Sequence, residues 1–428
     1  MPAAAVVAAP ARPPKRPRAD ASGMVRPERR TRGDVLAAAA IAAVVALVIA
    51  AFWWNSSART TVSRPAATAA ANLKAPQAVP VSLQQRWTAP SGKTRGPLVV
   101  SNTAITGDGH AVEGRDPQTG EQRWLYARDL ELCGVSYVYD LVVAVYPDDR
   151  GCGQVSGLKA GTGQRGPTRT SYADKQVVVS SDGSAVLSYG PTRLELWRSD
   201  LVRMLSYGEL DARVKPVNTA VGRGCTLMSA AASDASAAVL EACPSSPDLQ
   251  LTLLKPAKEE DEPDTKRVPL PGLPADSDAR VLAVSGTTAA VYLPTPRPVV
   301  AVYDDTGNRV SATELRVPPQ LGAGPAVTRA GDYLTWWTGT SVMVFDTTLD
   351  YRFTIDGTGD STALGPATMM AGRLLVPVRA GLAVYDPTGA QERIIALTHP
   401  VGEGAVLPVA AGSMVLEQRG ATVAGFGP

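Results

Sequence analysis

The sequence predicts an all-β fold: an eight-bladed β-propeller, with seven blades as the alternative count, preceded by one transmembrane helix. The first observation is a turn motif that recurs from residues 116, 159, 198, 255, 304, 346 and 386. A period of about 40–50 residues with four short strands per unit is typical of propeller blades. The second is a composition with 39 Gly and 35 Pro, which favours short strands joined by turns. The third is one uncharged apolar segment of membrane-spanning length near the N-terminus.

The chain begins with a basic segment, residues 1–33, which we expect to be a disordered cytoplasmic tail. Lysine and arginine outnumber acidic residues in it, and Ala, Pro and Arg dominate its composition. Met24 is an alternative start of translation, and either start leaves the same membrane topology.

Residues 34–54 are predicted to form a transmembrane helix. The run Val35–Trp54 carries no charge, and about 20 apolar residues span a bilayer core as a helix. The basic residues before it place the N-terminus in the cytoplasm by the positive-inside rule. We therefore expect a single-pass protein of the plasma membrane with an extracytoplasmic C-terminal domain. A cleaved signal peptide and a buried core helix are the alternatives, although a signal peptide usually has a shorter apolar stretch.

Residues 55–80 are expected to be a linker, and residues 81–428 the propeller. Ala, Thr and Pro fill the linker without helical or alternating periodicity. In the propeller, Asp, Pro and Gly recur in the turns because they cap amides, preset φ and accept positive φ. The clear copies are GRDPQTGEQ (114–122), GLKAGTGQR (157–165), AVYDDTGNR (301–309), MVFDTTLDY (343–351) and AVYDPTGAQ (383–391). Two degraded copies are LELWRSDLV (194–202) and LTLLKPAKE (251–259).

The two ends of the exported chain are predicted to share one blade. After the seventh turn, residues 404–428 supply three more strands and stop before a fourth. The piece Val81–Pro90 has no inner strands of its own, and its Gln-Arg-Trp repeats the Gln-Arg-Trp of residues 122–124. We expect this piece to complete the last blade, so that the ring has no unpaired terminal edge.

Four cysteines agree with an oxidising, extracytoplasmic compartment. We expect two disulfides, Cys133 with Cys152 and Cys225 with Cys243, because neither spacing is that of a zinc site. Buried free thiols are the alternative. Each bridge would close the ends of a strand hairpin, which is worth about 3 kcal/mol in the chain-entropy model.

Two resemblances extend this reading. The stretch Arg86–Trp124, which ends in DPQTGEQRW, resembles the repeat of pyrroloquinoline-quinone-type propellers, which include quinoprotein dehydrogenases and BamB-like scaffolds. The segments MVRPERRTRGD and LCGVSYVYDLVVAVYPDDRGCGQVS resemble an actinobacterial family of alanine- and valine-rich membrane proteins of unassigned function. These resemblances imply a fold and a location, not a mechanism. Quinone enzymes carry two adjacent cysteines in the cofactor pocket, and this sequence has none, so we expect no quinone cofactor.

Few residues suit catalysis or metal binding, and we predict no enzyme activity, no cofactor and no metal. His110 and His399 are the only histidines, and both are expected to be exposed in a turn or loop. No nucleophile-elbow, zinc-helix or P-loop motif occurs. An acidic insertion lacks the ligand spacing of a calcium loop and is expected to be solvated. Its members are Glu259, Glu260, Asp261, Glu262 and Asp264.

Tryptophans are the remaining candidates for binding. Trp124 and Trp197, late in their repeats, are expected to pack between blades. Trp336 and Trp337 are successive residues of one strand, so their side chains must face opposite sides. One can pack while its neighbour faces another sheet or the central channel, which makes the pair our candidate binding surface.

The predicted function is that of a non-catalytic docking or scaffold protein of the cell envelope, with an envelope protein or a lipid as partner. One alternative is a binding module for an envelope lipid or glycolipid in transit. Another is a cell-wall hydrolase or oxidoreductase with its site in the channel. A net charge of +2 gives no field that would collect nucleic acid, and we expect no such partner.

Overall fold

The computed structural model describes residues 31–54, 56, 59–209, 215, 217, 220–320, 322, 326–399 and 404–428. The chain divides into two units, Met1–Arg59 and Thr60–Pro428. Nearly all of the tail predicted for residues 1–33, including Met24, lies outside the described residues, so both expectations stay predictions.

The described part of the first unit is dominated by one helix, α1 (Arg32–Trp54). Its length and apolar composition suffice to cross a bilayer, a requirement that a signal sequence also meets. Its first turn is capped reciprocally: the Thr31 amide donates to the Asp34 carboxylate at 2.8 Å, and the Asp34 amide donates to the Thr31 hydroxyl at 3.2 Å. Every residue of α1 is exposed, so it is not a core helix.

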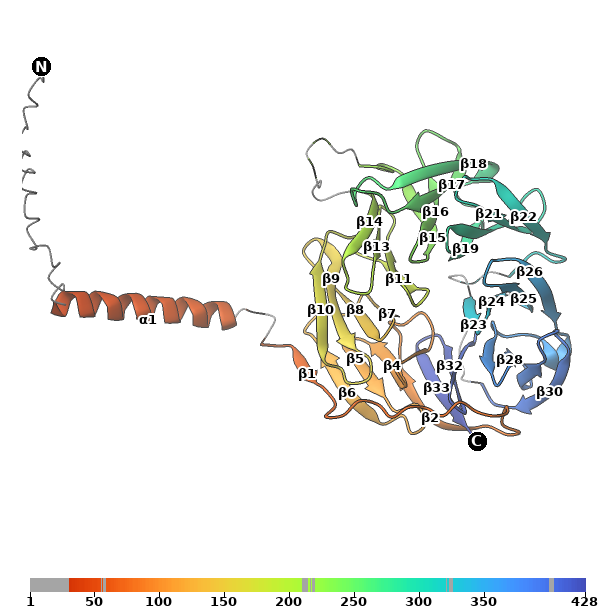
Figure 1. The fold of residues 1–428 in the computed structure, drawn as a ribbon, viewed down its shortest axis with the longest axis horizontal. Helices are drawn as coiled ribbons and strands as arrows, with labels where there is room; N and C mark the ends of the chain where they lie inside the picture. Colours follow the sequence, from red (N-terminus) through yellow and green to blue (C-terminus); the bar gives the residue numbers. More distant parts are fainter. Residues whose placement is uncertain are drawn as a thin grey trace, which may run out of the picture. The chain divides into compact units, whose positions relative to one another are not determined.

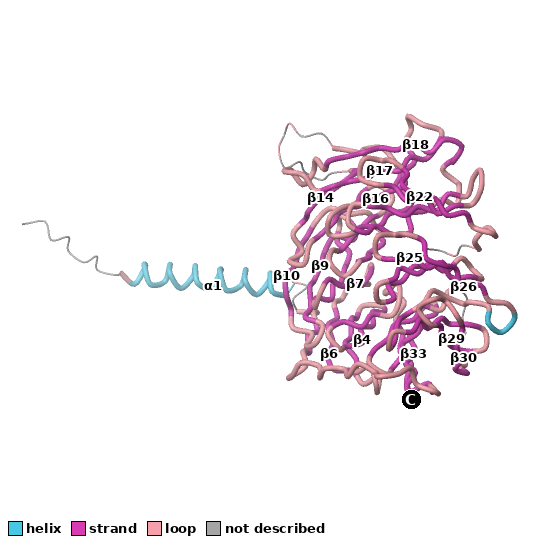
Figure 2. The backbone as a smooth tube through the Cα atoms, turned by 45° about the vertical axis from the view of Figure 1, so that its right-hand side comes forward, coloured by secondary structure: helices cyan, strands magenta, loops and turns pink. Residues whose placement is uncertain are grey.

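The second unit is an eight-bladed β-propeller (Figure 1). Eight sheets follow one another around a ring, and the strands within each sheet are antiparallel neighbours. The alternative of seven blades is therefore wrong. Figure 2 shows this unit as strands joined by loops, with one short helical turn, η1 (Gly359–Ser361), among its described residues.

The strands follow the chain in order, four to a blade. Blade 1 contains β3 (Leu98–Val100), β4 (Thr103–Asp108), β5 (Ala111–Arg115) and β6 (Gln122–Ala127), and blade 2 contains β7 (Gly134–Val138), β8 (Leu141–Asp148), β9 (Gly151–Lys159) and β10 (Arg165–Thr170). Blade 3 contains β11 (Val178–Ser181), β12 (Val186–Tyr189), β13 (Arg193–Trp197) and β14 (Arg203–Gly208), and blade 4 contains β15 (Thr226–Ala232), β16 (Ala237–Ala242), β17 (Asp248–Lys255) and β18 (Asp264–Pro274).

Blades 5 to 8 continue the pattern, with one change in the last. Blade 5 contains β19 (Arg280–Ser285), β20 (Thr288–Leu293), β21 (Val299–Tyr303) and β22 (Arg309–Glu314), and blade 6 contains β23 (Val327–Ala330), β24 (Tyr333–Trp337), β25 (Ser341–Asp346) and β26 (Tyr351–Asp356). Blade 7 contains β27 (Thr368–Met370), β28 (Arg373–Val378), β29 (Gly381–Tyr385) and β30 (Gln391–Ala396). Blade 8 contains β31 (Leu407–Ala411), β32 (Met414–Arg419) and β33 (Thr422–Gly427), and its fourth strand is β2 (Gln84–Pro90) from the start of the propeller. All seven turns identified in the sequence join the third and fourth strands of a blade.

The core lies between the blades. Eight clusters of buried apolar side chains are present among the described residues, one at each junction of neighbouring blades. Between blades 1 and 2, for example, Val112 and Trp124 belong to the same cluster as Val142 and Tyr146. Because both faces of a sheet meet a neighbour, strands such as β29 are buried at every residue and lack polar alternation.

Tryptophans of the outer strands explain the turn motif. The Trp124 indole Nε1 of β6 donates to the Ala160 carbonyl in the turn of blade 2 at 2.8 Å. Trp87 of β2 donates in the same way to Pro117 in the turn of blade 1 at 2.9 Å. A Cβ on Gly163 would lie 2.6 Å from the Trp124 ring, and Gly163 has a φ of +72°. Glycine is therefore required here both by the backbone conformation and by the neighbouring indole.

Strand β2 closes the ring, as predicted. It pairs antiparallel with β33, with Thr88 opposite Ala424, and the Arg86 guanidinium contacts the carbonyl of Pro428. Trp87 then joins the apolar cluster between blades 8 and 1. The first and last strands of the propeller thus protect each other's edges.

The segment predicted as a linker differs from the expectation. Residues Val62–Arg64 form β1, which adds a fifth strand to blade 1 by pairing with β6. Beyond it, the amides of Ala66 and Ala70 donate to the carbonyls of Thr162 and Gly161. All three side chains of β1 are exposed, so backbone hydrogen bonds hold the strand and its sequence carries no burial pattern.

Candidate functional site

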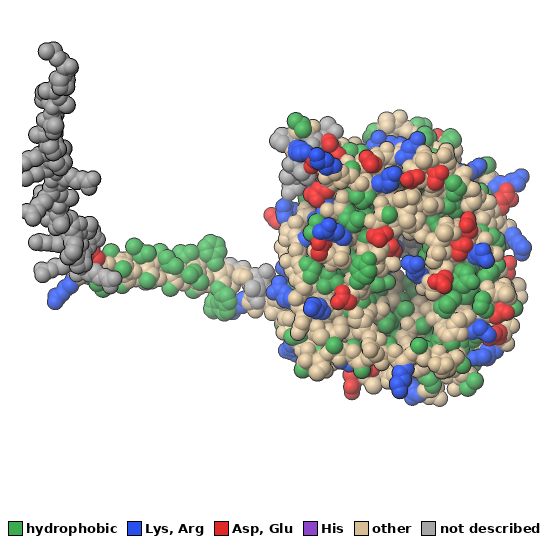
Figure 3. Space-filling model, viewed as in Figure 1, with side chains coloured by type: hydrophobic (Ala, Val, Ile, Leu, Met, Phe, Trp, Pro, Cys, Tyr) green, Lys and Arg blue, Asp and Glu red, His purple; other side chains and the backbone are tan. Residues whose placement is uncertain are grey.

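The centre of the propeller holds a cavity of about 550 Å³. It is lined by the inner strands β3, β7, β11, β15, β19, β23 and β31, together with the turns beside them. In the space-filling view, the middle of this face is hollowed (Figure 3). Segments far apart in the chain meet here because each blade places its first strand next to the ring axis. A concave site of this size suits a small molecule or a short peptide segment.

The cavity wall mixes apolar and hydroxyl side chains. Leu98, Leu282 and Leu334 supply apolar surface from three different blades. The serines of the wall are Ser136, Ser180, Ser181, Ser184, Ser233 and Ser285. Some of these hydroxyls also join blades: Ser233 Oγ of blade 4 donates to the Gly286 carbonyl of blade 5 at 2.6 Å. The wall can therefore contact apolar groups and form hydrogen bonds with polar groups of the same ligand.

Charges of both signs complete the cavity. The charged residues are Arg95, Asp182, Asp234 and Arg329. The Asp182 carboxylate is oriented by the amides of Ser184 and Ala185, at 2.8 and 3.0 Å. Burial raises the pKa of Tyr137, the charge of Asp182 acts in the same direction, and Arg329 opposes it. Tyr137 therefore keeps its proton at neutral pH and can act as a hydroxyl donor.

Both predicted disulfides are confirmed. Cys225 precedes β15 and Cys243 follows β16, so this bridge staples a hairpin as expected. The other bridge differs in detail, because Cys133 precedes β7 whereas Cys152 lies in β9. It spans the intervening strand β8 instead of closing one hairpin. Both bridges act within single blades, blade 4 and blade 2.

The tryptophans pack against neighbouring blades. Trp124 and Trp197 are each 1% exposed, which confirms their predicted place between sheets. Trp336 is also 1% exposed and lies 5.5 Å, between ring centroids, from Tyr292 of blade 5. Trp337 faces the other way and its Nε1 donates to the Ala363 carbonyl at 2.9 Å. Neither Trp336 nor Trp337 lines the central cavity, and their role as a binding surface stays a prediction.

The two histidines have opposite environments. His110 is exposed in the turn between β4 and β5, as predicted. The expectation that His399 is exposed is wrong, because its side chain is only 6% exposed. Its Nδ1 lies 2.8 Å from the Glu417 carboxylate, and its Nε2 lies 2.8 Å from the Val378 carbonyl. Both ring nitrogens thus face acceptors, an arrangement that favours the protonated imidazolium.

The acidic insertion is only partly solvated, contrary to the prediction. Asp261 is 1% exposed, and Glu260 forms an ion pair with Arg203 of blade 3. The Glu260 carbonyl also accepts a hydrogen bond from the Ser206 amide at 2.7 Å. The insertion therefore folds against the neighbouring blade, a contact that its local composition does not reveal.

Two buried glutamates were also missed by the sequence reasoning. Glu241, fully buried in β16, accepts hydrogen bonds from the Tyr207 hydroxyl at 2.7 Å and from Gln250 at 3.2 Å. Glu195, 3% exposed in β13, lies among three arginines. A glutamate flanked on both sides by apolar residues within a strand, as in RLELW and AAVLEA, is the signal that would have found both.

Comparison with known proteins adds little beyond the fold. No protein-family model and no curated protein matches the chain, so the resemblance to an actinobacterial family stays a prediction. Among solved structures, dihydro-heme d1 dehydrogenase NirN in complex with DHE has a TM-score of 0.48 and 12% identity, over 80% of this chain and 79% of that chain. The Pan2 WD40 domain of Neurospora crassa has a TM-score of 0.41 and 12% identity, over 70% and 89% of the two chains. Likenesses this distant carry no argument about activity.

Proposed function

We propose that this chain is a membrane-anchored, non-catalytic docking protein of the cell envelope, and that its partner is a protein that places a polypeptide segment in the central cavity. The observation that carries the proposal is the composition of the cavity wall, in which several blades contribute apolar, hydroxyl and charged side chains to one concave surface. An extended peptide presents the same mixture of apolar side chains and backbone polar groups.

The anchoring half of the proposal rests on α1 and on the disulfides. The helix has the length and composition of a membrane span, and two disulfides are typical of a compartment outside the cytoplasm. The basic residues before the helix favour a cytoplasmic N-terminus. The propeller would then act on the outer side of the plasma membrane.

Site-specific photo-crosslinking in native membranes tests the docking role. A photoreactive phenylalanine derivative replaces Tyr137 in the cavity or, as the control, Tyr351, which is 42% exposed on the outer strand β26. We expect one protein partner to be crosslinked at position 137 and not at position 351. Recovery of a lipid instead would contradict docking and favour the lipid-binding alternative. Turnover of a cell-wall substrate by the purified chain would contradict the non-catalytic role.

A further inference from the structure

A second cavity, of about 520 Å³, lies at the outer part of blades 2 and 3 and shares no lining residue with the central one. Strand β10 and the residues after it form one wall, and the turn between β13 and β14 forms another. Four arginines line this cavity, which we call the arginine cleft: Arg150, Arg169, Arg193 and Arg203. They come from two blades and meet only in the folded chain.

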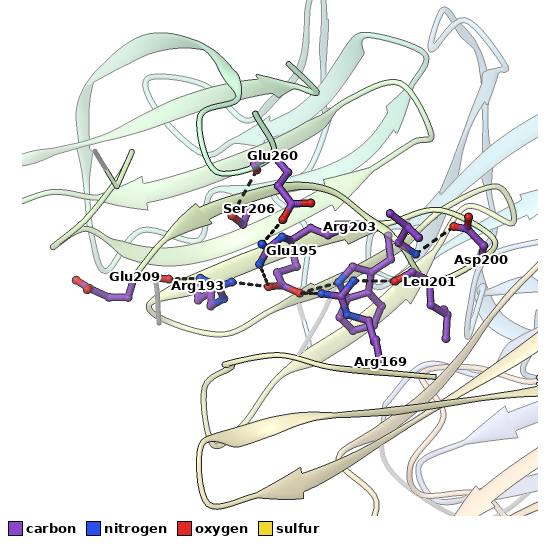
Figure 4. A network of polar contacts seen from close by, with 11 residues as sticks. Arg169, Arg193, Glu195, Asp200, Leu201, Arg203, Ser206, Glu209 and Glu260 are labelled. Carbon is purple, nitrogen blue, oxygen red and sulfur yellow. Dashed lines mark hydrogen bonds and ion pairs between the residues drawn. The ribbon is translucent and has the colours of Figure 1, made fainter. Parts of the chain in front are cut away.

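Behind the cleft, one carboxylate holds three of these arginines together. Figure 4 shows Arg169, Arg193 and Arg203 directed at Glu195. Arg169 and Arg203 each place a terminal nitrogen 3.0 Å from a Glu195 oxygen, and Arg193 also pairs with it. The Trp197 Nε1 donates to the same carboxylate at 2.8 Å. With two donors on each oxygen, Glu195 has used the acceptor capacity of a carboxylate.

The three guanidinium groups carry more donors than this carboxylate can accept. Within the described part of the chain, their other hydrogen bonds go to the Leu201 carbonyl from Arg169, at 2.7 Å, to the Glu209 carbonyl from Arg193, and to Glu260 from Arg203. Arg169 and Arg193 also lie over the rings of Trp197 and Tyr172. Among the described residues, the buried Nε atoms of all three arginines have no hydrogen-bond partner. Arg193 is only 4% exposed, so the shortage of acceptors affects a side chain that water barely reaches.

The cluster also has a surplus of positive charge. Burial disfavours the charged form of Glu195, but its three arginines outweigh burial and hold its pKa below the ordinary value, so it is ionised. Among the described residues, the three arginines form ion pairs with two carboxylates, those of Glu195 and Glu260, so positive charges outnumber negative ones by one in these pairs. Burial lowers the pKa of Arg169, and its arginine neighbours add to this effect against the opposing glutamates.

The rim of the cleft adds a further cation and several hydroxyl groups. Arg150 is 41% exposed there, and Asp148 at 3.9 Å is one of its contacts. Asp200, which also lines the cleft, is held by Arg198 in a two-point contact at 2.9 and 2.6 Å and does not compensate the cluster. The hydroxyl-bearing residues of the lining are Thr168, Thr170, Ser171 and Tyr172.

We propose that the arginine cleft is a binding site for a phosphate monoester carried by a small polyol, such as a sugar or glycerol. A phosphate offers several oxygens to donors approaching from different strands, whereas a planar carboxylate matches a single arginine fork. The volume exceeds that of inorganic phosphate, and the hydroxyl groups along β10 suit the hydroxyls of a polyol. The negative charge of the ligand would offset the surplus of the cluster.

Calorimetric titration of the full-length protein in neutral detergent tests this site with glucose 6-phosphate, and glucose serves as the uncharged control. Arg150→Ala removes the rim cation without touching Glu195, and Thr170→Glu places a negative charge in the cleft. Arg297→Ala, at a side chain 75% exposed on blade 5, is the matched control. We expect saturable binding of the phosphate ester only, weakened about tenfold or more by the two cleft variants and unchanged by the control.

A second pair of ligands separates the two sources of such a group. Glycerol 3-phosphate represents a soluble metabolite, and a short-chain phosphatidic acid below its micelle concentration represents a lipid head group. Tighter binding of either one supports the proposal and identifies the source. The proposal is overturned if none of the esters binds at concentrations up to about 10 mM, or if Arg150→Ala and Thr170→Glu bind like the wild type. Neither result bears on docking at the central cavity, which has its own crosslinking test.

Discussion

Two sets of blades reach the same architecture by different means. In the regular blades 5 to 7, the turn aspartates Asp304, Asp346 and Asp386 each accept two backbone hydrogen bonds within the turn. In the divergent blades 3 and 4, whose turn motifs are degraded, buried Glu195 and Glu241 form contacts between strands and between blades instead. Blade 4 also carries the Cys225–Cys243 bridge.

The blades of one repeat fold can therefore be stabilised in different ways. Turn hydrogen bonds are local, so they recur in the sequence and can be read from it. In a buried ion network, the loss of hydration of both partners offsets much of their electrostatic attraction. Such networks therefore contribute little net stability compared with apolar packing. These networks occur in blades 3 and 4, where the turn motif is degraded. The network around Glu195 also lies behind the arginine cleft, where we propose ligand binding.

Removing the central carboxylate of blade 3 should have the largest effect. Glu195→Ala leaves three arginines without their shared partner, and breaking a buried ion pair in this way costs about 3–5 kcal/mol. The measurement is the free energy of unfolding in urea. Glu314→Ala, at an exposed pair with Arg297, should cost less than about 1 kcal/mol. Equal losses in the two variants would contradict the idea that buried charge holds the divergent blades.

Loss of the blade 4 disulfide should rank next. The double substitution Cys225→Ser and Cys243→Ser frees a loop with a sequence separation of 18, worth about 3 kcal/mol in the chain-entropy model. The same change at Cys133 and Cys152, with a separation of 19, should cost a similar amount in blade 2, whose turn motif is a clear copy. Thermal unfolding of both variants beside the wild type checks this. A much larger loss in blade 4 would mean that the divergent blades depend on their bridge more than loop entropy explains.

A glycine in the turn of blade 2, which is a clear copy of the motif, should show a smaller loss of stability. Gly163→Ala places a Cβ against the Trp124 ring, whereas Gly372→Ala has the same φ of +72° with nothing within 4 Å. Backbone strain is therefore matched, and the added clash should cost Gly163→Ala about 1–3 kcal/mol more. Urea unfolding of the two variants measures the difference. If they are equally stable, the indole does not dictate the turn residue.

The smallest effect should be a dependence on pH from His399. Burial alone would lower the pKa of its imidazole, but Glu417 and the carbonyls of Val378 and Gly381 outweigh burial and raise it. Folding therefore favours the protonated form, which stabilises the protein fully below the unfolded pKa of about 6.5. This stabilisation is lost as pH rises through the higher folded pKa.

Unfolding of the wild type and of His399→Gln at a series of pH values checks this linkage. The stability advantage of the wild type should shrink from acidic to alkaline pH. Parallel stability curves for the two proteins would show that folding leaves the pKa of this histidine unchanged, which would contradict the prediction. The regular turn aspartates cannot mimic this trend, because their lowered pKa values affect stability only in the acid range.

Much of the fold could be predicted because its signals repeat. Short local sequence patterns were enough to predict the turns with their aspartates, the role of Trp87 in β2 and the two disulfides. Strand β1 could not be found, because a three-residue edge strand with exposed side chains has no periodicity. The arginine cleft could not be found either, since Arg150 and Arg203 meet only when blades 2 and 3 pack. His399 was misplaced for the same reason: its partner Glu417 belongs to the next blade.

The closure of the ring by β2 and β33 has a consequence for synthesis. Arg86 and Pro428, which touch in the folded protein, are separated by 342 residues along the chain. At about 5–20 residues per second, the ribosome needs roughly 20–70 s between them. For that time, β2 lacks its partner β33 and is an open edge that other chains can pair with. Rapid burial of Trp87 against blade 1 would shield this edge during synthesis, and a chain terminated before β33 would leave it without its partner strand.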